Sequence, residues 1–394
     1  MDRRQFIRVL GFGVGAVALS STIKACGGLE SQVMDYGWSG PSADITDIRL
    51  KVLSYAVLAP NPHNKQPWIV RMTGPTSFEL YVDPERLLPE TDPFFRQIHI
   101  GQGTFLETLA IAATGLGHKA EIELFPQIEL FPQGVYSNTE LLNKPVAAIK
   151  LVAQDNITAD PLFPYLLARH SNKREYDARP LSQAQMDTLN TFHRQHNQYP
   201  LTMVYSPEDK KQMEAVLTQS MQIEVGDHAR DMETIAMFRF NDDEMRKYRD
   251  GFGTAQSGLS GIKRILVENF FLSRESAEKD PTEFGQQSVA MTQKAAQSTG
   301  TFAWLSSATN SRLDQVNVGR DYCRINLKIT AMGLAMHPMS QVLQEYDEML
   351  PLQASFKQHF GIKESDTVQM LFRLGTAEAT PHSPRRAIGD IVRG

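Results

Sequence analysis

Two glycine-bounded apolar segments, one in each half of the chain, constrain its fold more than any other feature. Gly103–Gly117 is matched in length by Gly319–Gly333, at an offset of 216 residues. Apolar positions recur in register between the two segments, and Thr114 is matched by an identical Thr330. A long apolar helix that ends on a glycine C-cap is common, but here each copy follows a strand-like or polar stretch and precedes another strand candidate. The pattern therefore predicts two related halves, each built around a central helix.

The first half is expected to span residues 45–155 and the second residues 165–394. Ile122–Gln127 recurs unchanged as Ile128–Gln133, a small tandem duplication that lengthens a strand or loop. In the first half we expect a helix over Ile45–Leu58 and strands over Trp68–Met72, Phe78–Val82, 120–131 and 146–152. In the second half we expect a helix over Ser182–His196, with Ser182 as its N-cap. The strands expected there are Leu201–Tyr205, Phe302–Ser306 and Val368–Leu374.

The stretch 207–300 is too long and too periodic to be a loop. It is rich in Met, Phe and charged residues, and glycines stand at positions 251, 253, 258 and 261. Helices broken by a glycine-rich elbow fit a lid over a site. They fit a structural appendage that caps exposed core equally well, and the sequence leaves both interpretations open.

The overall charge gives no indication of a nucleic-acid partner. The chain has 394 residues, a net charge of -5 and a pI near 6.1, so any anionic ligand must be held by a local cluster of cations. The two cysteines, Cys26 and Cys323, exclude a disulfide scaffold. No Cys/His cluster has the spacing of metal ligands.

The first 26 residues are expected to be a targeting segment. Arg3 and Arg4 precede a short apolar run over Val9–Leu19, a pattern that resembles the twin-arginine export signal. The run is too short for a membrane-spanning helix. The sequence around Cys26 resembles a lipoprotein processing site, so lipidation of Cys26 and simple cleavage nearby both stay open. We expect a periplasmic or inner-membrane-anchored protein that meets the membrane only through such an anchor.

Two short motifs point to the chemistry. The loop Ala59–Trp68 (APNPHNKQPW) follows an apolar stretch, and Arg169–Lys173 (RHSNK) lies 105 residues beyond Asn64. Each resembles a flavin-contacting motif of the FMN-dependent nitroreductase family, closest to its twin-domain exported branch, the Acg-type FMN-binding oxidoreductases. In that family the basic segment comes first in the subunit. The reversed order here implies an α/β (α+β) nitroreductase-like fold duplicated in one chain, resembling an intramolecular nitroreductase dimer.

The resemblance assigns the flavin phosphate to the basic segment. Arg169 and Ser171 match phosphate contacts, since a guanidinium offers a planar fork to phosphate oxygens. Lys173 matches the cation near the N1/O2 edge of the isoalloxazine, and His170 a further contact in the same segment. Arg385, with Arg386 close behind, resembles the C-terminal basic element that returns to the same phosphate.

The loop is expected to reach the flavin from the other half. The amides of Asn64 and Gln66 match contacts along the pyrimidine edge, and Pro60 and Asn61 belong to the same loop. Pro62 and His63 depart from the small residues usual in the family. A last pair, Met339 and Ser340, matches by position the turn that supplies backbone groups near flavin N5.

These residues imply an FMN-binding oxidoreductase of nitroreductase type that reduces a small-molecule acceptor, such as a nitroaromatic or a quinone, through flavin N5. The chain is expected to be a monomer with one composite FMN site. Two alternatives stay open: a protein that sequesters flavin without turnover, and an envelope lipoprotein without flavin. The second alternative requires the loop, the basic segment and the arginine pair all to be coincidences.

Overall fold

The structure is a computed structural model that describes residues 37–127 and 143–393. The expected targeting segment, including Cys26, and the second copy of the repeated hexapeptide lie outside the described residues. Within them, no helix is long and apolar enough to cross a membrane.

The first half contains an antiparallel sheet built from four strands that lie in the order β1-β2-β4-β3. A short helix, α3 (Ile48–Ala56), precedes the sheet, and Asp47 caps it by accepting a hydrogen bond from the backbone N–H of Arg49. The long helix α4 (Arg96–Gly115) connects the second strand to the third. The strands are β1 (Trp68–Gly74), β2 (Ser77–Val82), β3 (His118–Leu124) and β4 (Ala147–Ala153).

The second half repeats this topology. Its sheet has the order β5-β8-β10-β9, again antiparallel throughout. Helix α6 (Gln183–His196) precedes the sheet and begins in a capping box at Ser182, as predicted. The long helix α13 (Arg312–Ala331) connects the second strand to the third. The strands are β5 (Leu201–Val204), β8 (Thr301–Ser307), β9 (Ala335–Pro338) and β10 (Thr367–Gly375).

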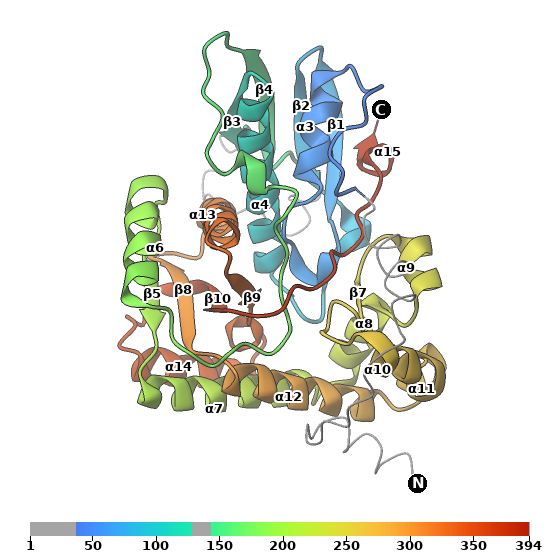
Figure 1. Ribbon diagram of the computed structural model, residues 1–394, viewed down its shortest axis with the longest axis vertical. Helices are drawn as coiled ribbons and strands as arrows, with labels where there is room; N and C mark the ends of the chain where they lie inside the picture. The colour runs from blue at the N-terminus through green and yellow to red at the C-terminus, as the bar shows by residue number, and fades with distance from the viewer. Residues whose placement is uncertain (1–36, 128–142, 394) are drawn as a thin grey trace, which may run out of the picture.

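Each half therefore places its strands in the order first, second, fourth, third and crosses from the second to the third through a long helix (Figure 1). The predicted α/β class is confirmed, and the two sheets have the similar strand order that a repeated half requires. Two helix starts were predicted too late. The central helices begin at Arg96 and Arg312, seven residues before the glycines that were expected to bound them.

The two central helices pack against each other at those glycines. A Cβ on Gly103 would lie 1.8 Å from the Val316 carbonyl oxygen, and a Cβ on Gly319 would lie 2.0 Å from that of Ile100. The contacts are reciprocal, because 316 and 319 are the counterparts of 100 and 103 at the offset of 216. A twofold interface has this property: if one residue contacts another, its counterpart makes the mirror contact. The halves meet around a local twofold axis at this crossing.

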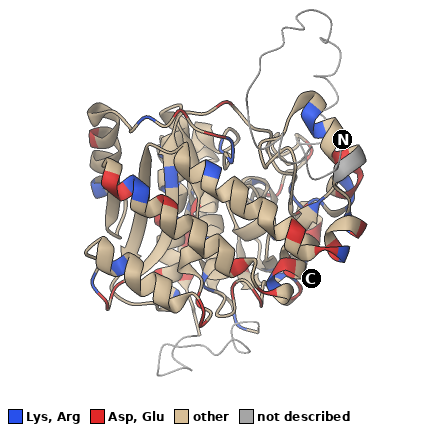
Figure 2. Ribbon diagram, turned by 90° about the horizontal axis from the view of Figure 1, so that it is seen from below, with Lys and Arg blue, Asp and Glu red and all other residues tan. Residues whose placement is uncertain are grey.

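The stretch 207–300 forms a mostly helical insertion between β5 and β8. Its two long helices, α7 and α12, lie side by side across the base of the second sheet (Figures 1 and 2) and carry charges of both signs. The smaller helices gather beside the first half, close to the end of the chain (Figure 1). The elements are α7 (Pro207–Glu224), α8 (His228–Met237), β6 (Phe238–Arg239), α9 (Asp242–Tyr248), β7 (Phe252–Gly253), α10 (Gly261–Leu266), the π-helical η5 (Val267–Phe271), α11 (Arg274–Lys279) and α12 (Pro281–Gln297).

The C-terminal segment crosses from the second half to the first. After α14 (Leu350–His359) and β10, the chain runs along the molecule to α15 (Ile388–Ile391) and β11 (Val392–Arg393) (Figure 1). Strand β11 pairs in parallel with β1 and becomes the edge of the first sheet. The predicted boundary, which gave all of 165–394 to the second half, is wrong for this segment. Four short 3-10 turns complete the described elements: η1 (Pro62–Asn64), η2 (Pro84–Arg86), η4 (Phe163–Tyr165) and η6 (Gln341–Leu343).

Replacing Gly103 with alanine tests the helix crossing. The new methyl group must push the Val316 carbonyl away, so we expect the free energy of unfolding to fall by roughly 1–3 kcal/mol or more. Urea denaturation measures the change. Gly389→Ala is the control, since no atom lies within 4 Å of its Cβ position, and it should change the stability by no more than about 1 kcal/mol. Equal effects of the two substitutions would contradict the close crossing.

Candidate functional site

Two arginines distant in sequence converge on one carbonyl oxygen in the interior. Arg169 Nη2 donates to the Leu58 oxygen at 2.8 Å, and Arg385 Nη2 donates to the same oxygen at 3.3 Å. Both side chains come from the part of the chain assigned to the second half, whereas Leu58 belongs to the first half and lies two residues after the end of α3. The predicted convergence of Arg169 and Arg385 is therefore present in the structure.

This arginine pair is buried without a compensating charge. Each residue is 4% exposed, and neither forms an ion pair with any described carboxylate. Burial lowers the pKa of Arg169, and burial together with the positive charge of Arg169 lowers the pKa of Arg385 well below its usual value. Two desolvated guanidinium groups are costly unless an anion joins them. The buried Arg385 Nε atom lacks a hydrogen-bond partner in the described structure. A phosphate group would supply both the missing partner and the missing negative charge.

A tryptophan that the sequence analysis did not single out lies against this pair. The ring of Trp38 lies 5.5 Å from Arg169 Cζ and 5.0 Å from Arg385 Cζ. It stacks on His382 at 3.9 Å and donates from Nε1 to the Ser383 oxygen. Burial, followed by the charge of Arg169, lowers the pKa of His382 to about 4. His382 is therefore neutral at pH 7 and adds no charge to the arginine pair.

The other members of the basic segment lie around this stack. His170 approaches His382 at 5.7 Å, and its Nδ1 lies 3.1 Å from the Ala168 oxygen. Ser171 is half-buried. The third predicted cation in this region, Arg386, is committed to the protein: it donates to the Gln66 and Asp390 oxygens and pairs with Asp83 at 3.4 Å. Its predicted part in holding the phosphate stays a prediction, although these contacts already engage its guanidinium.

The loop amides tie three segments of the chain together. Asn64 Nδ2 donates to the oxygens of Gly251 and Pro384, and Asn64 Oδ1 accepts from Arg385 Nη1 at 2.7 Å. Gln66 Nε2 donates to the Arg249 oxygen, while its Oε1 accepts from the Arg386 N–H. Both side chains were predicted along the flavin edge. In the structure their amides have protein partners that fix the loop, and their contact with the flavin edge stays a prediction.

The first residues of the loop are held from within and from α4. Asn61 Oδ1 accepts from the Gln66 N–H at 2.7 Å, and the Pro60 oxygen accepts from Thr104 Oγ1 at 2.5 Å. Asn64 and Gln66 have left-handed φ values of 53° and 52°, a conformation that costs energy in residues other than glycine. The hydrogen bonds hold the loop in this shape against that strain.

A second group of side chains meets at Phe252, in the insertion. Lys173 Nζ lies 4.1 Å from the centre of its ring, and His63 approaches the ring edge-on at 5.5 Å. Burial, followed by the charge of Arg373, lowers the pKa of Lys173 to about 8. Burial and the charge of Lys173 lower the pKa of His63 to about 4. The loop, the basic segment and the insertion therefore meet at one place, around a half-buried cation and an aromatic ring.

Strand β9 places His337 near Lys173, whereas the predicted residues Met339 and Ser340 follow the end of the strand. Met339 is buried in the core behind the second sheet, and its N–H donates to the Leu371 oxygen. Ser340 begins η6, where its oxygen accepts from the Leu343 N–H. That Met339 and Ser340 lie near flavin N5 stays a prediction, although the Met339 N–H already has a partner in the protein. His337, two residues earlier, accepts from Arg373 Nε at 3.1 Å. Burial, followed by the charges of Arg373 and Lys173, lowers the pKa of His337 well below its usual value.

The insertion is anchored to the first half by charged contacts. Asp250 pairs with Arg239 of the insertion at 2.5 Å and with Arg86 of the first half at 2.8 Å. The Gly251 N–H donates to the Asn64 oxygen. Glu233 accepts from the N–H and the hydroxyl of Thr91. These contacts hold the segment with Phe252 directly on the loop.

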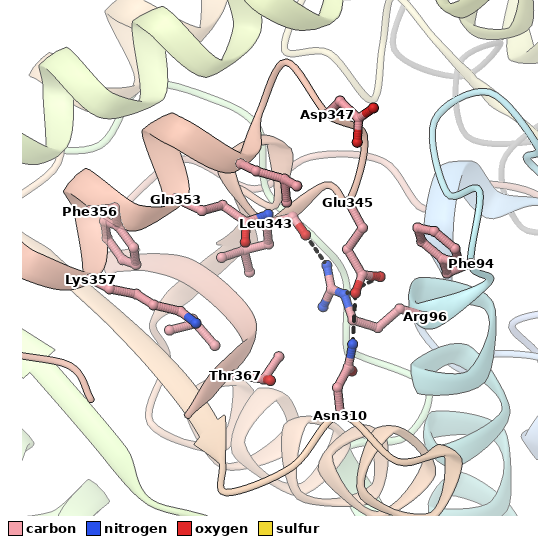
Figure 3. Close-up of a pocket in the computed structure, with 12 residues that line it drawn as sticks. Phe94, Arg96, Asn310, Leu343, Glu345, Asp347, Gln353, Phe356, Lys357 and Thr367 are labelled. Carbon is pink, nitrogen blue, oxygen red and sulfur yellow. Dashed lines mark hydrogen bonds and ion pairs between the residues drawn. The ribbon is translucent and has the colours of Figure 1, made fainter. Parts of the chain in front are cut away.

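A cavity of about 350 Å³ lies apart from these residues, at the start of α4 (Figure 3). Arg96 donates to the Leu343 and Gln369 oxygens and pairs with Glu345 at 3.4 Å. Glu345 also accepts from Asn310 Nδ2. None of the predicted site residues lines this cavity. The described residues contain no group of three or more His, Cys, Asp or Glu side chains that could hold a metal ion.

Comparison with curated proteins gives a likeness along most of the chain. A Mycobacterium tuberculosis H37Rv protein named "Putative NAD(P)H nitroreductase Rv3131" is 25% identical over 347 residues, which cover 86% of this chain and 90% of the relative. The chain is similar to a nitroreductase over most of its length. "Uncharacterized protein Rv3127" from the same organism is 41% identical over 75 residues, 18% of this chain and 22% of that protein. No family model matches.

Solved structures give a weaker likeness. The FMN-dependent nitroreductase NfnB from Mycobacterium smegmatis, in complex with NADPH, is 12% identical with a TM-score of 0.35, over 58% of this chain and 94% of that one. A nitroreductase from Anabaena variabilis is 10% identical with a TM-score of 0.38, over 82% of both chains. The sequence likeness along most of the chain and the strand order repeated in the two halves agree with a nitroreductase-like fold.

Substituting Lys173 with methionine tests this half-buried cation in the flavin-free protein. The folded pKa of about 8 lies below the usual lysine pKa of 10.5, so folding with a charged Lys173 is unfavourable by up to about 3 kcal/mol. The variant should therefore be more stable than the wild type at pH 7. This advantage should shrink between pH 8 and 10.5, where the wild-type lysine folds uncharged while the unfolded chain still binds the proton.

Urea denaturation at several pH values measures this difference. Lys363→Met, at an exposed position, serves as the control and should show no such pH-dependent advantage. A stability difference between Lys173→Met and wild type that stays constant from pH 7 to 10.5 would show that folding does not lower the pKa of Lys173.

Proposed function

We propose that this protein is an FMN-dependent oxidoreductase of nitroreductase type, related to the twin-domain Acg-type branch, that reduces small acceptors such as nitroaromatics or quinones. The observation that carries the proposal is the buried, uncompensated pair of Arg169 and Arg385, which meet at the Leu58 oxygen. The name of a similar protein supports it, since one relative is called an NAD(P)H nitroreductase.

The chain's own groups suit the parts of a flavin mononucleotide. Arg169 and Arg385 would hold the phosphate, with Ser171 nearby as a further donor. Lys173 would lie toward the isoalloxazine, where a cation favours the anionic reduced state. Phe252 and His63 supply apolar and aromatic surface beside that lysine. When bound, FMN would supply the hydride chemistry, by accepting a hydride at N5 and passing electrons to the acceptor.

The site is composite in this proposal. The first half supplies Leu58 and the loop, and the second supplies Arg169 and Lys173, while Arg385 arrives on the segment that joins the two. We infer that the chain arose by internal duplication and acts as a monomer that binds one FMN, in the way that a nitroreductase dimer builds a site from two subunits. The reciprocal contacts of Gly103 and Gly319 support this inference.

The place of action also belongs to the proposal. The paired arginines near the start of the sequence favour export by the twin-arginine route, which carries folded proteins and suits one that acquires its cofactor in the cytoplasm. The mature protein would then be periplasmic, or anchored to the inner membrane through a lipid on Cys26.

Alanine at either arginine of the pair tests the phosphate site. Each charge-assisted hydrogen bond contributes roughly 1.5–3 kcal/mol, so Arg169→Ala and Arg385→Ala should each weaken FMN binding by about tenfold or more. Fluorescence titration of the flavin-free protein with FMN gives the dissociation constant. The control is Arg179→Ala, an exposed arginine whose side chain pairs with Asp177, which should bind FMN like the wild type.

Thermal unfolding of each variant distinguishes loss of FMN from loss of the fold. An affinity for FMN that stays at the wild-type value in both folded variants would place the phosphate elsewhere and contradict the proposed site.

The main alternative is a protein that sequesters flavin without turnover. It is favoured by the contacts of the insertion with the loop, since Gly251 is hydrogen-bonded to Asn64, and by the position of Trp38 against the arginine pair. A closed cover of this kind would keep an acceptor from the flavin. Exported proteins also meet little NAD(P)H, so the natural donor could differ from the one in the relative's name.

Anaerobic mixing of the FMN-loaded protein with NADPH, followed by a quinone, separates the two functions. The oxidoreductase should lose its yellow absorbance within the mixing experiment and regain it when the quinone is added. A protein that binds FMN yet stays oxidised with NADPH, and is not reoxidised by quinone after reduction by dithionite, would be the sequestering protein.

A further inference from the structure

A second cavity, of about 310 Å³, lies where the local twofold axis would place a counterpart of the arginine site, which is the region around Arg169 and Arg385. Near the arginine site, Gly101 faces the loop residues Asn61 and Pro62, and Thr104 bonds to Pro60. The residues 216 positions later are Asn317 and Arg320, and both line the second cavity.

The same offset of 216 residues relates α13 at the arginine site to α4 at the second cavity. Cys323 of α13 belongs to the same buried apolar cluster as Leu58, whose oxygen accepts from Arg169. Its counterpart 216 positions earlier is Glu107, which also lines the second cavity. The arginine site lies at the end of α3, and the cavity lies at the end of α6, the corresponding helix of the second half, at His196.

The chemistry of this cavity differs from that of the arginine pair. Glu107 binds Arg320 and Arg324, each at 2.8 Å, and Arg324 also pairs with Asp160 at 2.9 Å. No uncompensated pair of cations is present among the residues that line it. A flavin phosphate, which carries up to two negative charges, therefore has no site here.

Two side chains at this cavity, Arg320 and Asp321, can still bind a charged ligand. Arg320 is about one-third exposed, and only its Nε is engaged, by Glu107, within the described structure, so its two terminal nitrogens can form a planar fork for a carboxylate. Asp321 accepts the N–H groups of Gln198 and Tyr199, and burial raises its pKa to about 6. Helix α6 ends at the same cavity, where its terminal carbonyls attract a positive charge.

We propose that this cavity binds a small zwitterion of amino-acid size, with its carboxylate on Arg320 and its ammonium group between Asp321 and the end of α6. The neutral amide of Asn317 adds a polar contact at the wall. Fixed opposite charges on two sides of one cavity select a ligand that carries both charges. The inference does not depend on flavin binding.

Isothermal titration of the protein with L-glutamine tests the proposal, since this probe joins a zwitterionic end to a neutral side chain. We expect saturable binding with a dissociation constant of about 1 mM or below. Acetate and methylammonium, which each carry one of the two charges, should bind at least about tenfold more weakly. Acetate binding as tight as that of L-glutamine would contradict the zwitterion, and absence of saturation with L-glutamine up to about 10 mM would overturn the site.

Two variants locate the binding. Arg320→Gln removes the fork, and Asn317→Asp places a carboxylate one helical turn from Arg320 that competes for it; each should weaken L-glutamine binding by about tenfold or more. Arg194→Gln, at an exposed position of α6, is the control and should bind as the wild type does. Wild-type affinity in Arg320→Gln and Asn317→Asp would overturn the site, and the second variant keeps the test decisive if the first fails to fold.

Discussion

The close crossing of α4 and α13 at Gly103 and Gly319 is the contact on which the rest of the structure depends. Two helices can approach this closely only where neither carries a Cβ at the point of contact, and the reciprocal pattern with Val316 and Ile100 fixes a twofold relation between the halves. That relation decides which groups face one another. It brings the end of α3 to the arginine pair and the end of α6 to the second cavity, so two sites of different chemistry arise from one architecture.

The arginine site shows how a chain can use this arrangement without keeping it symmetric. The first half keeps a loop between α3 and β1 that α6 and β5 lack, and the C-terminal segment returns to the first half with Arg385. The loop's strained residues are held by hydrogen bonds to this segment and to the insertion. A desolvated pair of like charges is unfavourable in itself. Its persistence at the meeting point of three segments is best explained by an anionic ligand.

Much of the fold followed from the sequence because the signals were local. Glycine C-caps, the capping box at Ser182 and short apolar strands each depend on neighbouring residues, and the structure has them close to the predicted places. The starts of the central helices were missed because the first turns, Arg96–Gln102 and Arg312–Val318, are polar or mixed and do not extend the apolar repeat. Strand β11 follows the second half in sequence but pairs with β1 of the first half. This long-range pairing involves only two residues of β11, so it leaves no periodic pattern in the sequence.

The site was predicted in part for the same reason. Arg169, Lys173 and Arg385 lie in short motifs, and the structure brings them to the region shared by the two halves. Trp38, Phe252 and His337 carry no motif, and only the folded chain places them beside those cations. Conversely, Arg386, Asn64, Gln66 and Met339 matched by position, but their hydrogen-bonding groups found protein partners that sequence spacing cannot show.

The central claim is that one flavin mononucleotide lies between the halves with its phosphate on the arginine pair. A crystal structure of the protein grown with FMN tests this most directly. The account predicts one flavin per chain, with phosphate oxygens within hydrogen-bonding distance of Arg169 and Arg385 and the ring system near Lys173. A flavin bound by residues of one half alone, or in the cavity lined by Glu107 and Arg324, would contradict it.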